Sequence, residues 1–115
     1  MEYVSAILFA LSDPLRLRSL ALLAASGELC ACELTPTLQV SQPTISKHMA
    51  TLREAGLVRD RRDAQWVLYS LSADLPAWAR DAVDAALRGV RETPVHLDDL
   101  QRLTAARRPP RQRSA

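Results

Sequence analysis

The two cysteines of this sequence, Cys30 and Cys32, are the residues best suited to chemistry, and a single residue separates them. Thiolates are soft metal ligands, and the free N–H groups and dipole of a helix N-terminus stabilise them. The chain has no further cysteine, so a disulfide framework of the secreted type is excluded. The pair suggests a site for a soft ion. The plainer alternative is two small, half-buried thiols without a role, since cysteine is often buried.

Both cysteines are expected on a short helix over residues 29–38, with Leu29, Leu34 and Leu38 towards the core. Residues two apart on a regular helix point roughly 200° apart. Both sulfurs can therefore bind one ion only if the helix distorts. A distortion next to a DNA-reading helix would favour a state that fits DNA less well, which is what allosteric coupling requires.

Such a DNA-reading helix is predicted directly after this segment. Ser41 is a good N-cap, Pro43 is tolerated in the first turn, and Gly56 ends the helix. An apolar stripe at helical spacing consists of Ile45, Met49 and Leu52. The polar residues on the other face and its flanks are Gln42, Thr44, Ser46, Lys47, His48 and Thr51. The lack of a carboxylate before Glu54 suits a DNA groove, while an ordinary amphipathic helix with a solvated face is the alternative.

A β-hairpin is predicted to follow, with strands over residues 57–60 and 66–71 and a charged turn over residues 61–64. The two preceding helices are joined by a tight turn. Together these elements predict a mainly α, winged helix-turn-helix fold. Arg61 and Arg62 lie near the hairpin tip, where we expect them to contact DNA phosphates. The alternative is a solvated hairpin whose charges are partly neutralised by neighbouring aspartates.

Further helices flank this unit. Asp13 and Pro14 are typical of an N-cap and first helical residue, and Arg16 and Arg18 of that helix are expected to face outward. A long helix capped by Asp74 carries an apolar stripe of Leu75, Trp78, Ala79, Ala82, Val83, Ala86, Leu87 and Val90. We expect this stripe and the short N-terminal helix to form a dimer seam, with packing inside one chain as the alternative.

The length of 115 residues suits one domain, which would gain stability from dimerisation. We divide the chain into a DNA-binding and dimerisation domain over residues 1–92, a weak helical segment over 93–106 and a basic disordered tail over 107–115. The tail holds four arginines, so the net charge of +2 becomes −2 without them, and a basic DNA footprint must be local. Neither a membrane-spanning run nor a secretory signal is evident, so a cytoplasmic protein is expected.

Taken in order, these motifs resemble the ArsR/SmtB family of winged-helix metalloregulatory repressors, and within it the arsenite-responsive repressors. The resemblance covers residues 5–90 and rests on LFALSDPLRL (8–17), ELCACEL (28–34), SQPTISKH (41–48), LREAGLV (52–58) and WVLYSLS (66–72). It implies a homodimer on double-stranded operator DNA that is released when arsenic(III) or antimony(III) binds Cys30 and Cys32, with no permanent cofactor. The DNA-binding residues we expect are Ser41, Gln42, Thr44, Ser46, Lys47, His48, Arg61 and Arg62.

The chain departs from the family pattern at one position. Arsenite sensors of this type look like ELCVCDLC, and Thr35 stands where they have a third cysteine. A third arsenic ligand would then be water, hydroxide, a small thiol or the Thr35 hydroxyl. The resemblance implies that the first two cysteines suffice, at reduced affinity. A methylated trivalent arsenical needs only two sulfurs and is an alternative inducer.

Other functions for the cysteine pair have less support in the sequence. Cadmium and lead sensors of the family add cysteines near the N-terminus, and none precedes Cys30 here. His48 and His96 are the only histidines, with His96 expected at the surface, so one chain cannot fill a tetrahedral zinc site. A redox sensor with a reducible Cys30–Cys32 disulfide is a second hypothesis. A thiol oxidoreductase or soft-metal carrier is a third, but it needs no DNA-reading helix. The sequence holds no catalytic constellation, so an enzyme is not expected.

Overall fold

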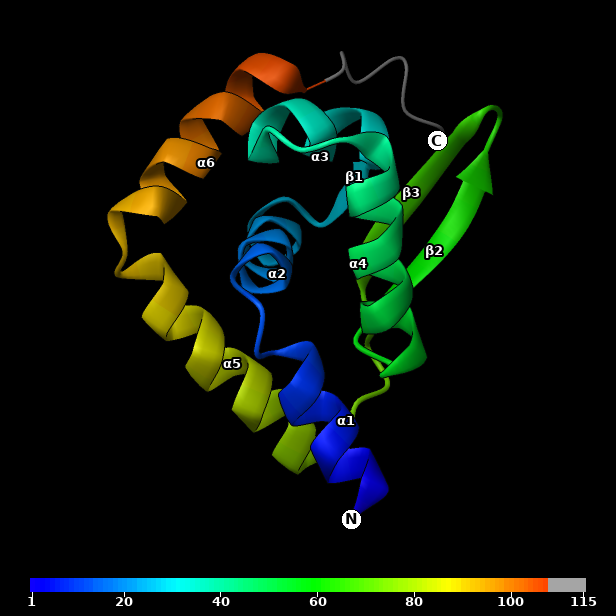
Figure 1. The fold of residues 1–115 in the computed structure, drawn as a ribbon, viewed down its shortest axis with the longest axis vertical. Coiled ribbons are helices and arrows are strands. Elements are labelled where there is room, and N and C mark those ends of the chain that lie inside the picture. The colour runs from blue at the N-terminus through cyan, green and yellow to red at the C-terminus, as the bar shows by residue number, and fades with distance from the viewer. Residues whose placement is uncertain (108–115) are drawn as a thin grey trace.

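Six helices and three strands make up the described part of the chain, residues 1–107 of a computed structural model (Figure 1). In chain order they are α1 (Glu2–Ala10), α2 (Pro14–Ser26), β1 (Glu28–Cys30), α3 (Ala31–Leu38), α4 (Gln42–Glu54), β2 (Val58–Asp63), β3 (Trp66–Leu71), α5 (Ala77–Arg91) and α6 (Pro94–Ala106). Apart from Arg107, the predicted basic tail lies outside the described residues.

Helix α2 begins and ends where its local chemistry requires. The Asp13 carboxylate accepts hydrogen bonds from the N–H groups of Leu15 and Arg16, and Pro14 occupies the first helical position. Gly27 follows the helix with φ of +85°, a conformation that glycine adopts without a Cβ clash. The predicted N-cap at Asp13 is confirmed.

Helices α3 and α4 form the predicted helix-turn-helix pair. Gln39 ends α3 in the left-handed conformation with φ of 59°, and the Ser41 hydroxyl caps α4 by accepting from the Thr44 N–H at 3.3 Å. The stripe of Ile45, Met49 and Leu52 is fully buried in the core. The tight turn and the buried stripe were both predicted, and both are confirmed.

The sheet has three strands rather than the two of a simple hairpin. All pairs are antiparallel in the order β1-β3-β2, and Cys30 of β1 lies opposite Leu68 of β3. The prediction of one helix over residues 29–38 was therefore wrong at its start, because residues 28–30 pair with β3 and the helix begins at Ala31. The predicted charged turn over 61–64 was also wrong. Strand β2 runs to Asp63, and the tight turn falls on residues 64–65.

Helices α5 and α6 are the last two helices of the described residues and pack against the earlier ones. The predicted cap at Asp74 was wrong: α5 begins at Ala77, and the Asp74 carboxylate instead accepts from the Arg59 guanidinium. Helix α6 lies along α3 (Figure 1) and sends Leu103 into the shared core. His96 on α6 is buried, which corrects its expected surface position. No helix within residues 1–107 combines the length and apolar character needed to cross a membrane.

Two arginines expected to face outward point into the protein instead. Arg16 is buried and donates to the carbonyl oxygens of Ala10 and Phe9 at the end of α1. Arg18 donates two hydrogen bonds to the fully buried carboxylate of Asp99 on α6, and this hydrogen bonding to Asp99 raises the pKa of Arg18. The prediction that these side chains face outward was wrong, because helical spacing gives no information about acceptors on distant segments.

Candidate functional site

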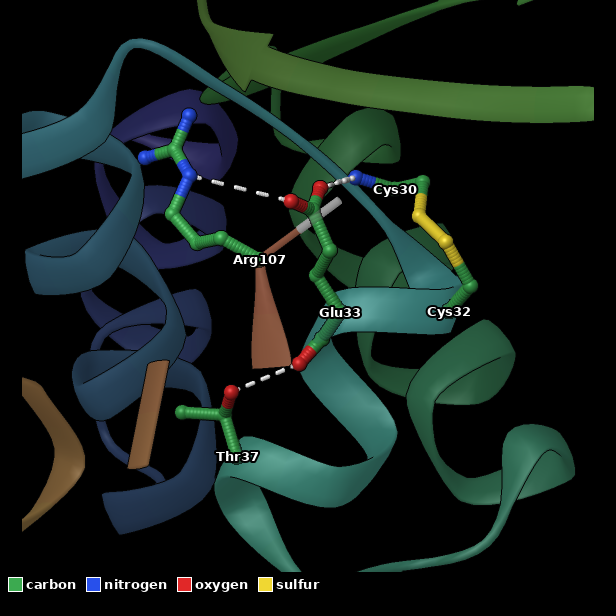
Figure 2. The surroundings of a disulfide bond; sticks show 5 residues. All are labelled: Cys30, Cys32, Glu33, Thr37 and Arg107. Carbon is green, nitrogen blue, oxygen red and sulfur yellow. Dashed lines mark hydrogen bonds and ion pairs between the residues drawn. A yellow bond between two sulfur atoms is a disulfide. The ribbon is translucent and has the colours of Figure 1, made fainter. Parts of the chain in front are cut away.

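The two cysteines meet at the junction of β1 and α3. Cys30 ends the strand and serves as N-cap of the helix with extended backbone angles (φ −86°, ψ 162°), while Cys32 lies in the first turn. Their Cα atoms are 5.1 Å apart, and their sulfurs are joined as a disulfide (Figure 2). The prediction that the sulfurs lie on opposite sides of a helix was wrong, because Cys30 precedes the helix. Both sulfurs can therefore reach one atom while α3 stays regular.

A buried carboxylate supports the pair from inside. Glu33, three residues after the N-cap, accepts a hydrogen bond on Oε1 from the N–H of Cys30 at 2.9 Å, which is half of a capping box. The Glu33 carbonyl accepts from the Thr37 hydroxyl at 2.6 Å, and Oε2 lies 3.8 Å from Nε of Arg107 (Figure 2). Sequence reasoning missed Glu33. The signal was present in the C-x-x-E spacing, with cysteine in place of the usual serine or threonine.

A surface hollow of about 220 Å³ borders the cysteines. Its lining residues are Cys30, Ala31, Cys32, Gln42, Gln65, Trp66 and Val67. Gln42 is the first residue of α4, and Gln65 and Trp66 lie where the hairpin turns into β3. Cys30 is buried, whereas Cys32 is half-buried at the edge of this hollow. A small molecule entering the hollow would thus meet the cysteine pair and both elements expected to contact DNA.

The two cysteines supply the thiol ligands of this region. Across residues 1–107, no group of three or more histidine, cysteine, aspartate or glutamate side chains is placed to hold a metal ion. The arrangement offers two sulfurs and no third protein ligand of these types. It therefore suits a species that needs two thiolates rather than a four-coordinate zinc or cadmium ion.

The polar face of α4 is presented to solvent as the DNA-reading hypothesis requires. Ser41, Gln42, Ser46 and Lys47 are exposed, and Thr44 is half-buried. Gln42 donates its side-chain N–H to the Ser46 hydroxyl at 3.3 Å. These side chains present hydrogen-bond donors and acceptors with one positive charge, a set able to read base edges and phosphates.

His48 differs from its neighbours because it is held against α2. Its Nδ1 lies 3.2 Å from the Arg16 guanidinium and 3.8 Å from the Asp13 carboxylate, and its side chain is 17% exposed. The ring of His48 thus lies between a cation and a carboxylate at the start of α2. Arg16 in this way connects α4 to the end of α1.

The two hairpin arginines have different surroundings. Arg61 lies within β2 and donates two hydrogen bonds of 2.7 Å to Glu28 of β1, which raises the pKa of Arg61. Arg62 is the next residue of the same strand and is exposed. Adjacent residues of a strand point to opposite faces of the sheet, so Arg62 points away from Glu28, the partner of Arg61.

Apolar side chains remain exposed on α1 and α5. They are Tyr3, Val4, Leu8, Phe9 and Trp78. The rings of Tyr3 and Trp78 meet edge to face with centroids 5.5 Å apart, so the two helices share one apolar surface. Exposed aromatic patches of this kind mark interaction surfaces.

A helix-turn-helix with an exposed polar second helix, followed by a β-hairpin, defines the class of winged helix-turn-helix DNA-binding proteins. Residues 13–60 match the model of the ArsR family of bacterial regulatory proteins. The chain belongs to this family and is a transcriptional regulator, not an enzyme.

Relatives and solved structures agree with this assignment. The chain is 54% identical over 80 residues to the arsenic resistance transcriptional regulator ArsR1 of Pseudomonas putida, matching 70% of this chain but only 59% of that protein. It is 49% identical over 82 residues to the arsenical resistance operon repressor of Escherichia coli, which covers 71% of this chain and 70% of that protein. The structure of HlyU from Vibrio cholerae superposes with a TM-score of 0.67 at 32% identity, over 79% of this chain and 95% of that one.

Proposed function

We propose that this protein is an arsenic(III)-responsive repressor that binds operator DNA as a homodimer and is released when arsenite or antimonite binds Cys30 and Cys32. One observation carries the proposal: the two sulfurs converge at the β1–α3 junction, beside a hollow walled by the start of α4 and by the hairpin. The relatives named for arsenic resistance support this inducer class. Arsenic would be the signal and not a resident cofactor.

The proposed DNA contacts come from α4 and the wing. Gln42, Thr44, Ser46 and Lys47 would enter the major groove, with Ser41 at the helix cap and His48 beside them on α4. Arg62 would contact phosphate directly. Arg61 would do so only after leaving Glu28.

The proposed dimer uses the apolar surface of α1 and α5. Tyr3, Leu8 and Trp78 are exposed there in the single chain, and burying them against a second copy would stabilise the pair. A symmetric dimer places two recognition helices on half-sites about 34–36 Å apart. Both the operator and the inducer would be met in the cytoplasm.

The release step starts from converging sulfurs. Arsenic bound by both thiolates would lie between the two sulfurs, beside the hollow that Gln42 and Trp66 also line. Displacing Gln42 and Trp66 would shift α4 and the wing together, without bending α3. A coupling of about 1.4 kcal/mol would lower operator affinity tenfold.

Two alternatives use the same cysteines. A trivalent methylated arsenical would need only the two sulfurs that the site provides. A redox-sensing repressor is supported by the disulfide that joins Cys30 and Cys32. Both alternatives keep DNA release as the output and differ only in the signal.

The test is fluorescence anisotropy of a labelled duplex from the region upstream of the gene for this chain. The reduced dimer is titrated onto the DNA, then challenged with arsenite, antimonite, methylarsenite, zinc or peroxide. We expect arsenite to release the wild type and to leave the Cys30→Ser and Cys32→Ser variants bound. Ser26→Ala is the matched control, since Ser26 is a half-buried residue of α2 that does not line the hollow. Release of both cysteine variants by arsenite would overturn the proposal, and release by peroxide alone would favour the redox sensor.

A further inference from the structure

The hollow beside the cysteines has walls that suit carbon better than an ion. Trp66, Val67 and Ala31 supply apolar surface, and Gln42 and Gln65 supply neutral amides at its edge. Its volume is about 220 Å³. An apolar cavity of roughly 150 Å³ holds a benzene molecule, so the hollow has room for a group of that size.

The ligand set leaves one position on a bound arsenic atom without a protein ligand. No third histidine, cysteine, aspartate or glutamate completes a metal-binding group with the pair in the described residues. The Glu33 carboxylate beside the pair is turned to the N–H of Cys30 and to Arg107 (Figure 2). The amides and the indole that line the hollow are poor ligands for a soft ion. The third position on arsenic would therefore have no protein ligand of these types, and both cysteines line a hollow with apolar surface.

We propose that the hollow is a subsite for the organic substituent of a trivalent organoarsenical, in particular an aryl group, and that Trp66 is the residue that selects it. This inference rests on the proposed function, because it requires arsenic on Cys30 and Cys32. An aromatic ring packed on the indole gains from apolar burial and from offset or edge-to-face contact. Inorganic arsenite, with a hydroxyl in the same place, gains neither.

The binding step is an exchange without redox change at arsenic. A cellular low-molecular-weight thiol first keeps the pair in the dithiol form. The arsenical R–As(OH)₂ then loses both hydroxyls: two As–O and two S–H bonds break, two As–S bonds form, and two water molecules leave. Arsenic remains trivalent and keeps its carbon substituent, which occupies the third position.

The subsite also makes release depend on the size of the substituent. Gln42 opens α4 and Trp66 opens β3, and both line the hollow, so a substituent that fills the hollow contacts the recognition helix and the wing. A methyl group buries less surface there than a ring does. We therefore expect phenylarsenite to release DNA at a lower concentration than methylarsenite.

The experiment compares phenylarsenite with methylarsenite, because both need two sulfurs and differ only in the substituent. Affinities are measured by isothermal titration calorimetry on the full chain, reduced with a phosphine that does not compete as a thiol. A peptide of residues 28–34 serves as reference, since it carries both cysteines without the hollow. The preference for phenyl over methyl should be about tenfold greater in the protein than in the peptide.

Variants of the hollow identify the source of this preference. Trp66→Ala should return the preference to the value of the peptide, whereas Leu97→Ala, at an exposed position of α6 outside the hollow, should leave it unchanged. Gln65→Glu, at an exposed position, places a charge at the edge of the hollow and should also reduce the preference. Gln101→Glu on the exposed face of α6 is its matched control.

The two proposals fail in different ways. A peptide-like preference in the wild type, unaffected by Trp66→Ala and Gln65→Glu, would overturn the subsite while arsenite still binds and releases DNA. Absence of binding by arsenite and by both organoarsenicals would overturn the arsenic site itself.

Discussion

Glu33 holds Cys30 by its backbone: its Oε1 atom accepts the N–H of Cys30 at 2.9 Å, and the carboxylate is fully buried. The other carboxylate oxygen lies 3.8 Å from the guanidinium of Arg107, just after α6 (Figure 2). The first cysteine of the pair is thus positioned from the protein interior by a group linked to the last helix. This connection gives the C-terminal end of α6 a part in positioning the cysteine pair.

The first prediction concerns Glu33. Replacing it with alanine removes the acceptor of the Cys30 N–H and should lower the free energy of unfolding by about 1–3 kcal/mol. Glu33→Gln keeps a neutral acceptor and should lower the free energy of unfolding by less than Glu33→Ala does. In the DNA-release assay, the arsenite concentration for half release should rise in the order wild type, glutamine, alanine. Urea unfolding and anisotropy measure the two effects, and equal behaviour of the two variants would show that Oε1 does not position Cys30.

The second prediction separates the two hairpin arginines. Arg62→Ala should weaken DNA binding and reduce the salt slope by about 1, because an exposed guanidinium is free to contact phosphate. Arg61→Ala should have a smaller effect, because Arg61 must first leave Glu28. Glu28→Gln should strengthen DNA binding, because a neutral amide binds the Arg61 guanidinium less tightly than a carboxylate does. Anisotropy at several salt concentrations measures these slopes. A larger loss from Arg61→Ala than from Arg62→Ala would contradict the assignment.

The third prediction concerns the buried carboxylate that joins three helices. Asp99 of α6 accepts from Arg18 of α2 and from Arg102, and Arg102 also donates to the Thr37 carbonyl of α3. Asp99→Asn should lower the free energy of unfolding by about 3 kcal/mol, since it leaves two guanidinium groups without their anion. Asp98→Asn changes the exposed neighbour and should alter stability by less than about 0.5 kcal/mol. Denaturant unfolding compares them, and equal stabilities would show that the network does not stabilise α6.

The helices were predictable from sequence where periodicity was long enough to measure. The stripe of Ile45, Met49 and Leu52 predicted the recognition helix, and Asp13 and Ser41 marked two helix starts that the structure confirms. Strand β1 was not predictable, because three residues show no period and the strand forms only by pairing with distant β3. This single element reversed the expected geometry of the cysteines.

Polar residues with distant partners form the second class that sequence reasoning missed. Arg16 and Arg18 were predicted to face outward, because the local sequence does not show that their hydrogen-bond acceptors lie on other helices. His96 was assigned to the surface by residue type, yet it is buried. Local spacing carries no information about such tertiary contacts. The cysteine pair and the polar face of α4, by contrast, could be proposed from sequence because their chemistry and spacing are local, and their roles stay predictions.

The fourth prediction tests the proposed dimer surface. Leu8 on α1 and Leu97 on α6 are exposed to a similar extent, 56% and 59%, so they form a matched pair of apolar surface positions. Leu8→Glu would place a charge and its symmetry mate within the interface, where an unpaired buried charge is costly. We expect this variant to sediment as a monomer and to lose most of its operator affinity, because one recognition helix then contacts one half-site. Leu97→Glu should remain dimeric with wild-type affinity. Sedimentation equilibrium and anisotropy decide the outcome, and a dimeric Leu8→Glu variant would place the interface elsewhere than on α1 and α5.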